Sequence, residues 1–168
     1  EDDQYIFTNE FGDINEPVSL RDDGGTDWLN AAAVTSNSTI DLATGTLTID
    51  GRDATIESWV DIENVATGDG QDTLIGNELS NHLISGRGDD TITASRGNDT
   101  IEMGKGTDTV VFAGNKEDYT LAFNAVTRTV TVSRSYNDGA TPVTETDTLT
   151  GVEILQFADQ SYSLSTDL

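Results

Sequence analysis

The feature that most constrains this chain is a nine-residue unit that runs five times without a break between residues 67 and 111. The units read TGDGQDTLI, GNELSNHLI, SGRGDDTIT, ASRGNDTIE and MGKGTDTVV. Place six is always aspartate or asparagine, and place eight is always aliphatic. Place six is held by Asp72, Asn81, Asp90, Asp99 and Asp108, and place eight by Leu74, Leu83, Ile92, Ile101 and Val110. A fixed period over this many copies indicates a repeat architecture.

The units are similar to the GGxGxDxUx pattern of RTX, or hemolysin-type, calcium-binding repeats. This resemblance implies an all-β fold, a parallel β-roll in which each unit supplies one turn and one short strand. Two units then make one coil of 18 residues, so alternate units stack on the same edge of the roll. The first edge carries the turns 67–72, 85–90 and 103–108, and the second edge carries the turns 76–81 and 94–99.

Five units form a short stack whose open strand edges and apolar ends must be covered. We therefore expect residues 1–66 to form an N-terminal β flank and residues 112–168 to form a C-terminal antiparallel β cap, on either side of the roll at 67–111. Alternating and β-branched segments predict strands in both flanks. These are Tyr5–Phe7, Ser38–Leu42, Thr46–Ile49, Tyr119–Phe123, Arg128–Val132, Thr148–Thr150 and Ile154–Phe157.

The charge of the chain restricts its partners. It carries 31 acidic and 8 basic side chains, for a net charge of −23. Such a chain repels nucleic-acid phosphates and anionic membrane surfaces, so we expect neither as a partner, and it attracts cations. The absence of cysteine excludes disulfides and thiolate metal sites, and no apolar run is long enough to span a membrane.

The spacing of the acidic residues predicts where cations bind. Stacked coils lie ~4.8 Å apart, so place-six carboxylates on one edge repel each other unless a cation lies between them. Oxygen ligands without histidine or thiolate favour calcium over zinc or copper, and magnesium prefers to keep its waters. Asp72 with Asp90 and Asp90 with Asp108 give two sites on the first edge. Asn81 with Asp99 gives a weaker third site, so we expect about two to four calcium ions.

The resemblance also implies which further atoms bind the ions. In the family, places two, four and six of one turn meet places one, three and six of the turn stacked on it. Carried over, the sets are Gly68, Gly70 and Asp72 with Ser85, Arg87 and Asp90; Gly86, Gly88 and Asp90 with Met103, Lys105 and Asp108; and Asn77, Leu79 and Asn81 with Ala94, Arg96 and Asp99. The departures from the family pattern are Thr67, Ser85, Ala94 and Met103 for the first glycine, and Leu79 for the third.

Upstream of the roll, the chain resembles the C-terminal module of serralysin-type secreted metalloproteases. That module has a DGGxD loop, followed later by IENxxGGxGND, and the two form a further calcium site. The loop here is 22–27, and the later segment begins at 61–65. By this resemblance the side chains of Asp22, Asp27 and Glu63 bind the ion, together with the carbonyls of Gly24, Gly25 and Asp61.

His82, the only histidine, occupies place seven of unit two and should face outward from the roll. A single histidine excludes the HExxH zinc site of a serralysin catalytic domain. A Ser-His-Asp arrangement or a pair of catalytic carboxylates is still formally open in so acidic a chain, but no motif favours either. We therefore predict a non-catalytic module.

These features favour a calcium-binding module that folds on extracellular calcium and belongs to a larger exported bacterial protein. The resemblance implies type I secretion in an unfolded state, with an export signal near Leu155–Leu168. We expect a secreted monomer that is covalently linked to an upstream domain. The alternative is an adhesin or polysaccharide-binding module that uses the roll as a scaffold, and a small enzyme is a third hypothesis.

Overall fold

The computed structural model describes residues 2–9, 18–21, 24–57, 61–139 and 141–164. In these residues the chain forms two β-sheets that face each other across one apolar core. Sheet A contains, in spatial order, β1 (Gln4–Thr8), β3 (Asp27–Ala33), β7 (Ile62–Ala66), β9 (His82–Ile84), β11 (Thr100–Glu102), β15 (Thr141–Thr150), β14 (Thr129–Asp138) and β13 (Tyr119–Asn124). Sheet B contains β17 (Ser161–Ser163), β16 (Ile154–Gln156), β12 (Thr109–Val111), β10 (Thr91–Thr93), β8 (Thr73–Ile75), β4 (Thr39–Asp41), β5 (Thr46–Ile49), β6 (Arg52–Ile56) and β2 (Val18–Leu20).

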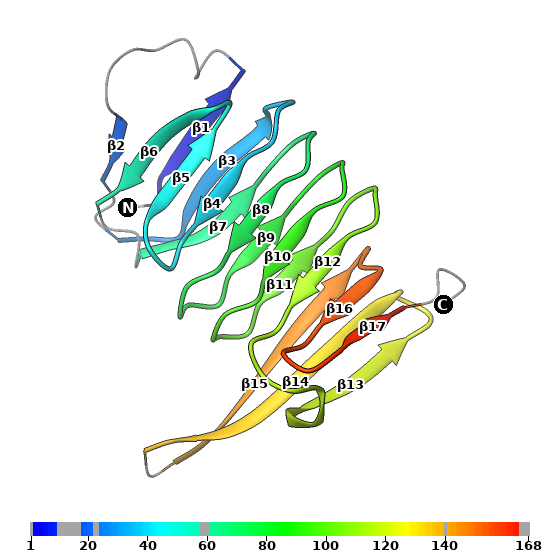
Figure 1. Cartoon of the computed structure of the whole chain (residues 1–168). Helices are drawn as coiled ribbons and strands as arrows, with labels where there is room; N and C mark the ends of the chain where they lie inside the picture. The colour runs from blue at the N-terminus through cyan, green and yellow to red at the C-terminus, as the bar shows by residue number, and fades with distance from the viewer. Residues whose placement is uncertain (1, 10–17, 22–23, 58–60, 140, 165–168) are drawn as a thin grey trace.

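The five repeat strands alternate between the two sheets, as the 18-residue period predicts. Strands β8, β10 and β12 pair in parallel in sheet B, with Thr91 opposite Thr73 on one side and Thr109 on the other. Strands β9 and β11 pair in parallel in sheet A, with Thr100 opposite His82. Every place-eight side chain is buried between the sheets. The predicted parallel β-roll is therefore confirmed, and Figure 1 shows its coils stacked along one axis.

The coils continue beyond the repeats at both ends. On the N-terminal side, β4 pairs in parallel with β8 and β7 with β9. On the C-terminal side, β15 pairs in parallel with β11 and β16 with β12. The C-terminal segment is thus only partly the antiparallel cap that the sequence predicts. Strand β14 is antiparallel to both β13 and β15, and β17 is antiparallel to β16, but β15 and β16 join the roll in parallel. This arrangement satisfies the open backbone groups of the last repeat strands.

The sequence pattern missed several strands of the flanks. Strands β2, β3, β6 and β7 were not predicted, and β15 is longer than the expected Thr148–Thr150 segment. Strand β15 forms a long hairpin with β14 that extends away from the roll (Figure 1).

An aromatic cluster fills the C-terminal end of the core. The rings of Phe112 and Phe157 stack with their centroids 5.4 Å apart, and Tyr119 lies 5.3 Å from each. The short 3-10 helix η3 (Lys116–Asp118) leads from the last repeat into β13. Among the described residues, no helix has the length and apolar character that a membrane span requires.

Candidate calcium sites

The first edge carries a continuous row of buried carboxylates. Asp72, Asp90 and Asp108 are 2%, 1% and 0% exposed. The backbone N–H of Asp72 donates to Asp90 Oδ1 at 2.8 Å, and that of Asp90 donates to Asp108 Oδ1 at 2.9 Å. The row continues at both ends, because Ser38 N–H donates to Asp72 Oδ1 and Asp108 N–H donates to Glu153 Oε2. Each carboxylate is therefore fixed by the coil that precedes it.

The second oxygen of each of these aspartates has no hydrogen-bond partner in the described structure. Oδ2 of Asp72, Asp90 and Asp108 is buried and unpaired. A buried carboxylate oxygen without a partner is strongly unfavourable, so such atoms suit a site where a cation or a proton neutralises them. Burial raises the pKa of Asp72 and of Asp108 to about 6, and it also raises the pKa of Asp90. Neighbouring carboxylates add to the rise, which is the repulsion that a bound cation would remove.

The turns on this edge bring backbone oxygens close to the carboxylates. The glycines at place four, Gly70, Gly88 and Gly106, have φ of 123°, 130° and 155°, which side chains disfavour. A Cβ on Gly88 would overlap the carbonyl oxygen of Gly70, and one on Gly106 would overlap that of Gly88. The stacked carbonyls therefore pass too close for any side chain. Together with the unpaired carboxylate oxygens, they form an oxygen-rich environment that suits calcium.

Place three of each turn stacks in the same register. Parallel bridges join Asp69 to Arg87 and Arg87 to Lys105. Arg87 N–H donates to Gly68 O and Lys105 N–H donates to Gly86 O, both at 2.9 Å. The structure thus brings together the two ligand sets predicted for the first edge. Their assignment as calcium ligands stays a prediction.

The non-glycine residues at place one form a buried column on the same edge. Thr67, Ser85 and Met103 are 2%, 0% and 5% exposed. The hydroxyl of Thr67 donates to Ser85 O at 2.9 Å, and the hydroxyl of Ser85 contacts Met103 Sδ at 3.9 Å. None of the three has a positive φ, so the first glycine of the family pattern is replaced here without strain.

The second edge differs because the oxygens of unit two already accept hydrogen bonds from neighbouring groups. Asn81 Oδ1 accepts from Asn77 N–H, and Asn81 Nδ2 donates to Glu63 O and Asn77 Oδ1 at 3.1 and 3.0 Å. The hydroxyl of Ser95 donates to the carbonyl of Asn77. Arg96 lies on the surface, where its Nη1 is 3.9 Å from Glu78 Oε1. The third predicted set is brought together, but its amides and hydroxyls bond to one another where a metal would need free oxygens.

The N-terminal loop brings two of its predicted ligands together. Asp27 is fully buried, its N–H donates to Glu63 Oε2 at 2.8 Å, and its Oδ1 accepts from Asp3 N–H at 2.6 Å. Its Oδ2 is buried and unpaired like those on the first edge. Gly24 and Gly25 lead into this strand with positive φ, and Asp61 precedes β7. Asp22 lies outside the described residues, so its predicted role is untested.

Two carboxylates that sequence reasoning missed extend the rows past the repeats. Glu153 follows Asp108 on the first edge, and Asp147 follows Asp99 on the second, with Asp99 N–H donating to Asp147 Oδ1 at 2.9 Å. In the described part of the chain, no point gathers three or more histidine or acidic side chains that could hold a metal. A calcium ion on either edge would thus bind two carboxylates and backbone carbonyls, for which the residues present are suitable.

Paired carboxylates on stacked turns of a parallel roll define a calcium-binding β-roll. The comparison with known families agrees: residues 75–110 match the RTX calcium-binding nonapeptide repeat family in four copies. The chain therefore contains an RTX module, and calcium is the ion of its repeats. No curated protein matches the chain.

Proposed function

We propose that this RTX module folds when it meets extracellular calcium and so supports type I secretion and stability of a larger exported protein. The observation that carries the proposal is the set of buried, unpaired Oδ2 atoms of Asp27, Asp72, Asp90, Asp99 and Asp108. These atoms are favourable only when a cation or a proton neutralises them. The module has no proposed catalytic role, because its carboxylates bond to the backbone of neighbouring coils.

The proposed mechanism is linkage between ion binding and folding. Without calcium, the charges of the place-six aspartates oppose stacking of the coils. Extracellular modules bind calcium with dissociation constants of about 10⁻⁴ to 10⁻³ M, far above cytosolic calcium concentrations. Ions that bind only the native state contribute their binding free energy to folding. The chain would therefore stay unfolded inside the cell, pass the secretion channel in that state and fold outside. We further propose that the export signal lies within residues 155–168.

A calcium titration of the calcium-free protein at about pH 8, followed by far-UV circular dichroism, tests this function. We expect a transition from a disordered spectrum to a β spectrum with a Hill coefficient above one, because Asp90 belongs to both sites of the first edge. Magnesium is the control ion and should give a much weaker response. A β spectrum that calcium does not change would contradict the proposal, and a Hill coefficient near one would contradict the sharing of Asp90.

A second candidate function is the binding of a polysaccharide, with the roll as scaffold. It is favoured by a surface cavity of about 300 Å³ whose lining includes Tyr119, Arg96 and Arg134. Aromatic and arginine side chains commonly contact sugars and uronates. A glycan array probed with the calcium-loaded protein separates the two functions, because a module that only folds and stabilises gives no hits.

A further inference from the structure

The second edge ends in a carboxylate pair that the repeat pattern does not contain. Strand β15 pairs with β11 so that Thr148 lies opposite Thr100 and Leu149 opposite Ile101. Leu149 is buried like the place-eight residues of the repeats. Asp147 consequently occupies place six of a further coil, although it is 48 residues beyond Asp99. The sequence Asp147-Thr148-Leu149 also repeats the Asp72-Thr73-Leu74 of unit one.

The bond between the two aspartates is the same as on the first edge. Asp99 N–H donates to Asp147 Oδ1 at 2.9 Å, as Asp72 N–H donates to Asp90 Oδ1 at 2.8 Å. Asp99 is 1% exposed and Asp147 is 6% exposed. Asp99 Oδ2 is buried without a hydrogen-bond partner. Two buried carboxylates thus lie one coil apart, and one of them has an oxygen that nothing in the described structure satisfies.

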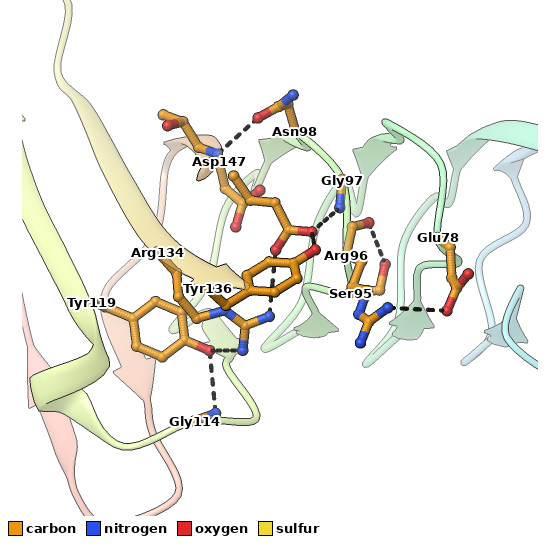
Figure 2. A network of polar contacts seen from close by, with 12 residues as sticks. Glu78, Ser95, Arg96, Gly97, Asn98, Gly114, Tyr119, Arg134, Tyr136 and Asp147 are labelled. Atoms are coloured by element: carbon orange, nitrogen blue, oxygen red, sulfur yellow. Dashed lines mark hydrogen bonds and ion pairs between the residues drawn. The ribbon is translucent and has the colours of Figure 1, made fainter. Parts of the chain in front are cut away.

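Arg134 is the cationic side chain that acts on Asp147, but its guanidinium is hydrogen-bonded to other residues. Arg134 Nη2 donates to Glu145 Oε2 at 3.4 Å, and Arg134 Nη1 donates to Tyr119 Oη at 3.3 Å. Figure 2 shows the side chain of Arg134 directed at Tyr119. The other oxygen of Glu145 accepts from Tyr136 Oη at 2.6 Å and from Gly97 N–H at 3.2 Å. Arg134 is therefore paired with Glu145, and no ion pair in the described residues joins a cationic side chain to Asp99 or Asp147.

We propose that Asp99 and Asp147 bind a calcium ion of their own, at the junction between unit four and β15. The site has two carboxylates, whereas the predicted pair of Asn81 and Asp99 has one. The side-chain amide of Asn81 is moreover already hydrogen-bonded to Glu63 and Asn77. Asp147 also lines the surface cavity of about 300 Å³, which gives an ion access from solvent. The bound ion would link β15 to the neighbouring coil of the roll and so stabilise the packing of the C-terminal strands. This proposal rests on the proposed function and assigns one of its sites.

Native mass spectrometry of the full chain with saturating calcium tests the site by counting bound ions. We expect Asp147→Asn to bind one ion fewer than the wild type, because the amide keeps the Oδ1 acceptor but removes the charge. Asp138→Asn is the control: it removes the same charge from an exposed position on β14 and should bind as many ions as the wild type. Circular dichroism of each variant in the same buffer verifies the fold.

The outcomes separate this site from the general function. If the wild type binds no calcium, the proposed function fails. If the wild type binds calcium and Asp147→Asn binds the same number of ions, this site alone is wrong and Arg134 suffices as counter-ion. A crystal structure of the wild type grown in millimolar calcium needs no variant. Calcium density against Asp99 Oδ2 supports the site, and its absence overturns the proposal even if Asp147→Asn does not fold.

Discussion

In calcium-free buffer the protein should gain β structure as the pH is lowered from about 8 to about 5.5. The direction follows from the buried aspartates. Burial raises the pKa of Asp72, Asp108 and Asp147 to about 6 and that of Asp99 to about 7, all from an ordinary value of 3.8. At the lower pH these groups are protonated in the native state, and their unpaired oxygens become hydrogen-bond donors or lose their charge.

The sign of the effect is opposite to that of an ordinary salt-bridged acid. A raised pKa means that the native state binds more protons than the unfolded chain. The resulting stability is fully present below pH 3.8 and is lost as the pH rises through about 6 for Asp72 and about 7 for Asp99. Saturating calcium reverses this dependence, because the ion binds only the deprotonated carboxylates. With calcium, the protein should therefore be more stable at pH 8 than at pH 5.5.

Thermal unfolding followed by circular dichroism, at both pH values and with or without calcium, measures the four conditions. The variant Asp99→Asn sharpens the test. At pH 8 it should raise the calcium-free melting temperature, because the amide is neutral, and lower the calcium-loaded one, because a ligand is lost. The exposed Asp138→Asn should change neither by a comparable amount. A calcium-free protein with equal β content at both pH values would contradict this account.

The repeat array could be predicted from the sequence because its period fixes the geometry. Nine residues per unit place every aliphatic residue of place eight inward and return each turn to the same edge after 18 residues. The burial of Leu83 and Ile92 and the register of β8, β10 and β12 follow directly. The turn glycines could be predicted for the same reason. At Gly88, for example, only glycine allows both the positive φ and the close approach of the stacked turn.

The ends of the carboxylate rows could not be predicted because the period is lost there. Strands β13 and β14 separate Asp147 from its coil neighbour Asp99, and the segment before Glu153 is too short to be a unit. Only a three-residue signal remained, the Asp-Thr-Leu of residues 147–149. At Asn81 the spacing fits a metal site, but the sequence does not reveal the hydrogen bonds from its amide to Glu63 and Asn77, because these depend on tertiary contacts.

The largest effect of a single substitution in the presence of calcium is expected for Asp90→Asn. Asp90 lies between Asp72 and Asp108 and takes part in both predicted sites of the first edge. The amide is isosteric and keeps the Oδ1 that accepts from Asp72 N–H, so packing and this hydrogen bond are preserved. Only the unpaired Oδ2 and its charge are lost. We expect two fewer bound ions and a calcium midpoint of folding that rises by at least about tenfold, which is ~1.4 kcal/mol.

The comparison with Asp72→Asn separates ion sharing from a general loss of charge. Asp72 takes part in only one predicted calcium site, because its other neighbour in the row is Ser38. The Asp72→Asn variant should therefore lose one ion. Asp69→Asn removes a charge from the same turn at a half-exposed side chain and should lose none. Ion counts by native mass spectrometry and midpoints by circular dichroism measure all three. Equal losses for Asp90 and Asp72 would mean that the coils bind calcium independently. A graded loss requires that one buried carboxylate connects two ions, which makes the roll fold as a unit.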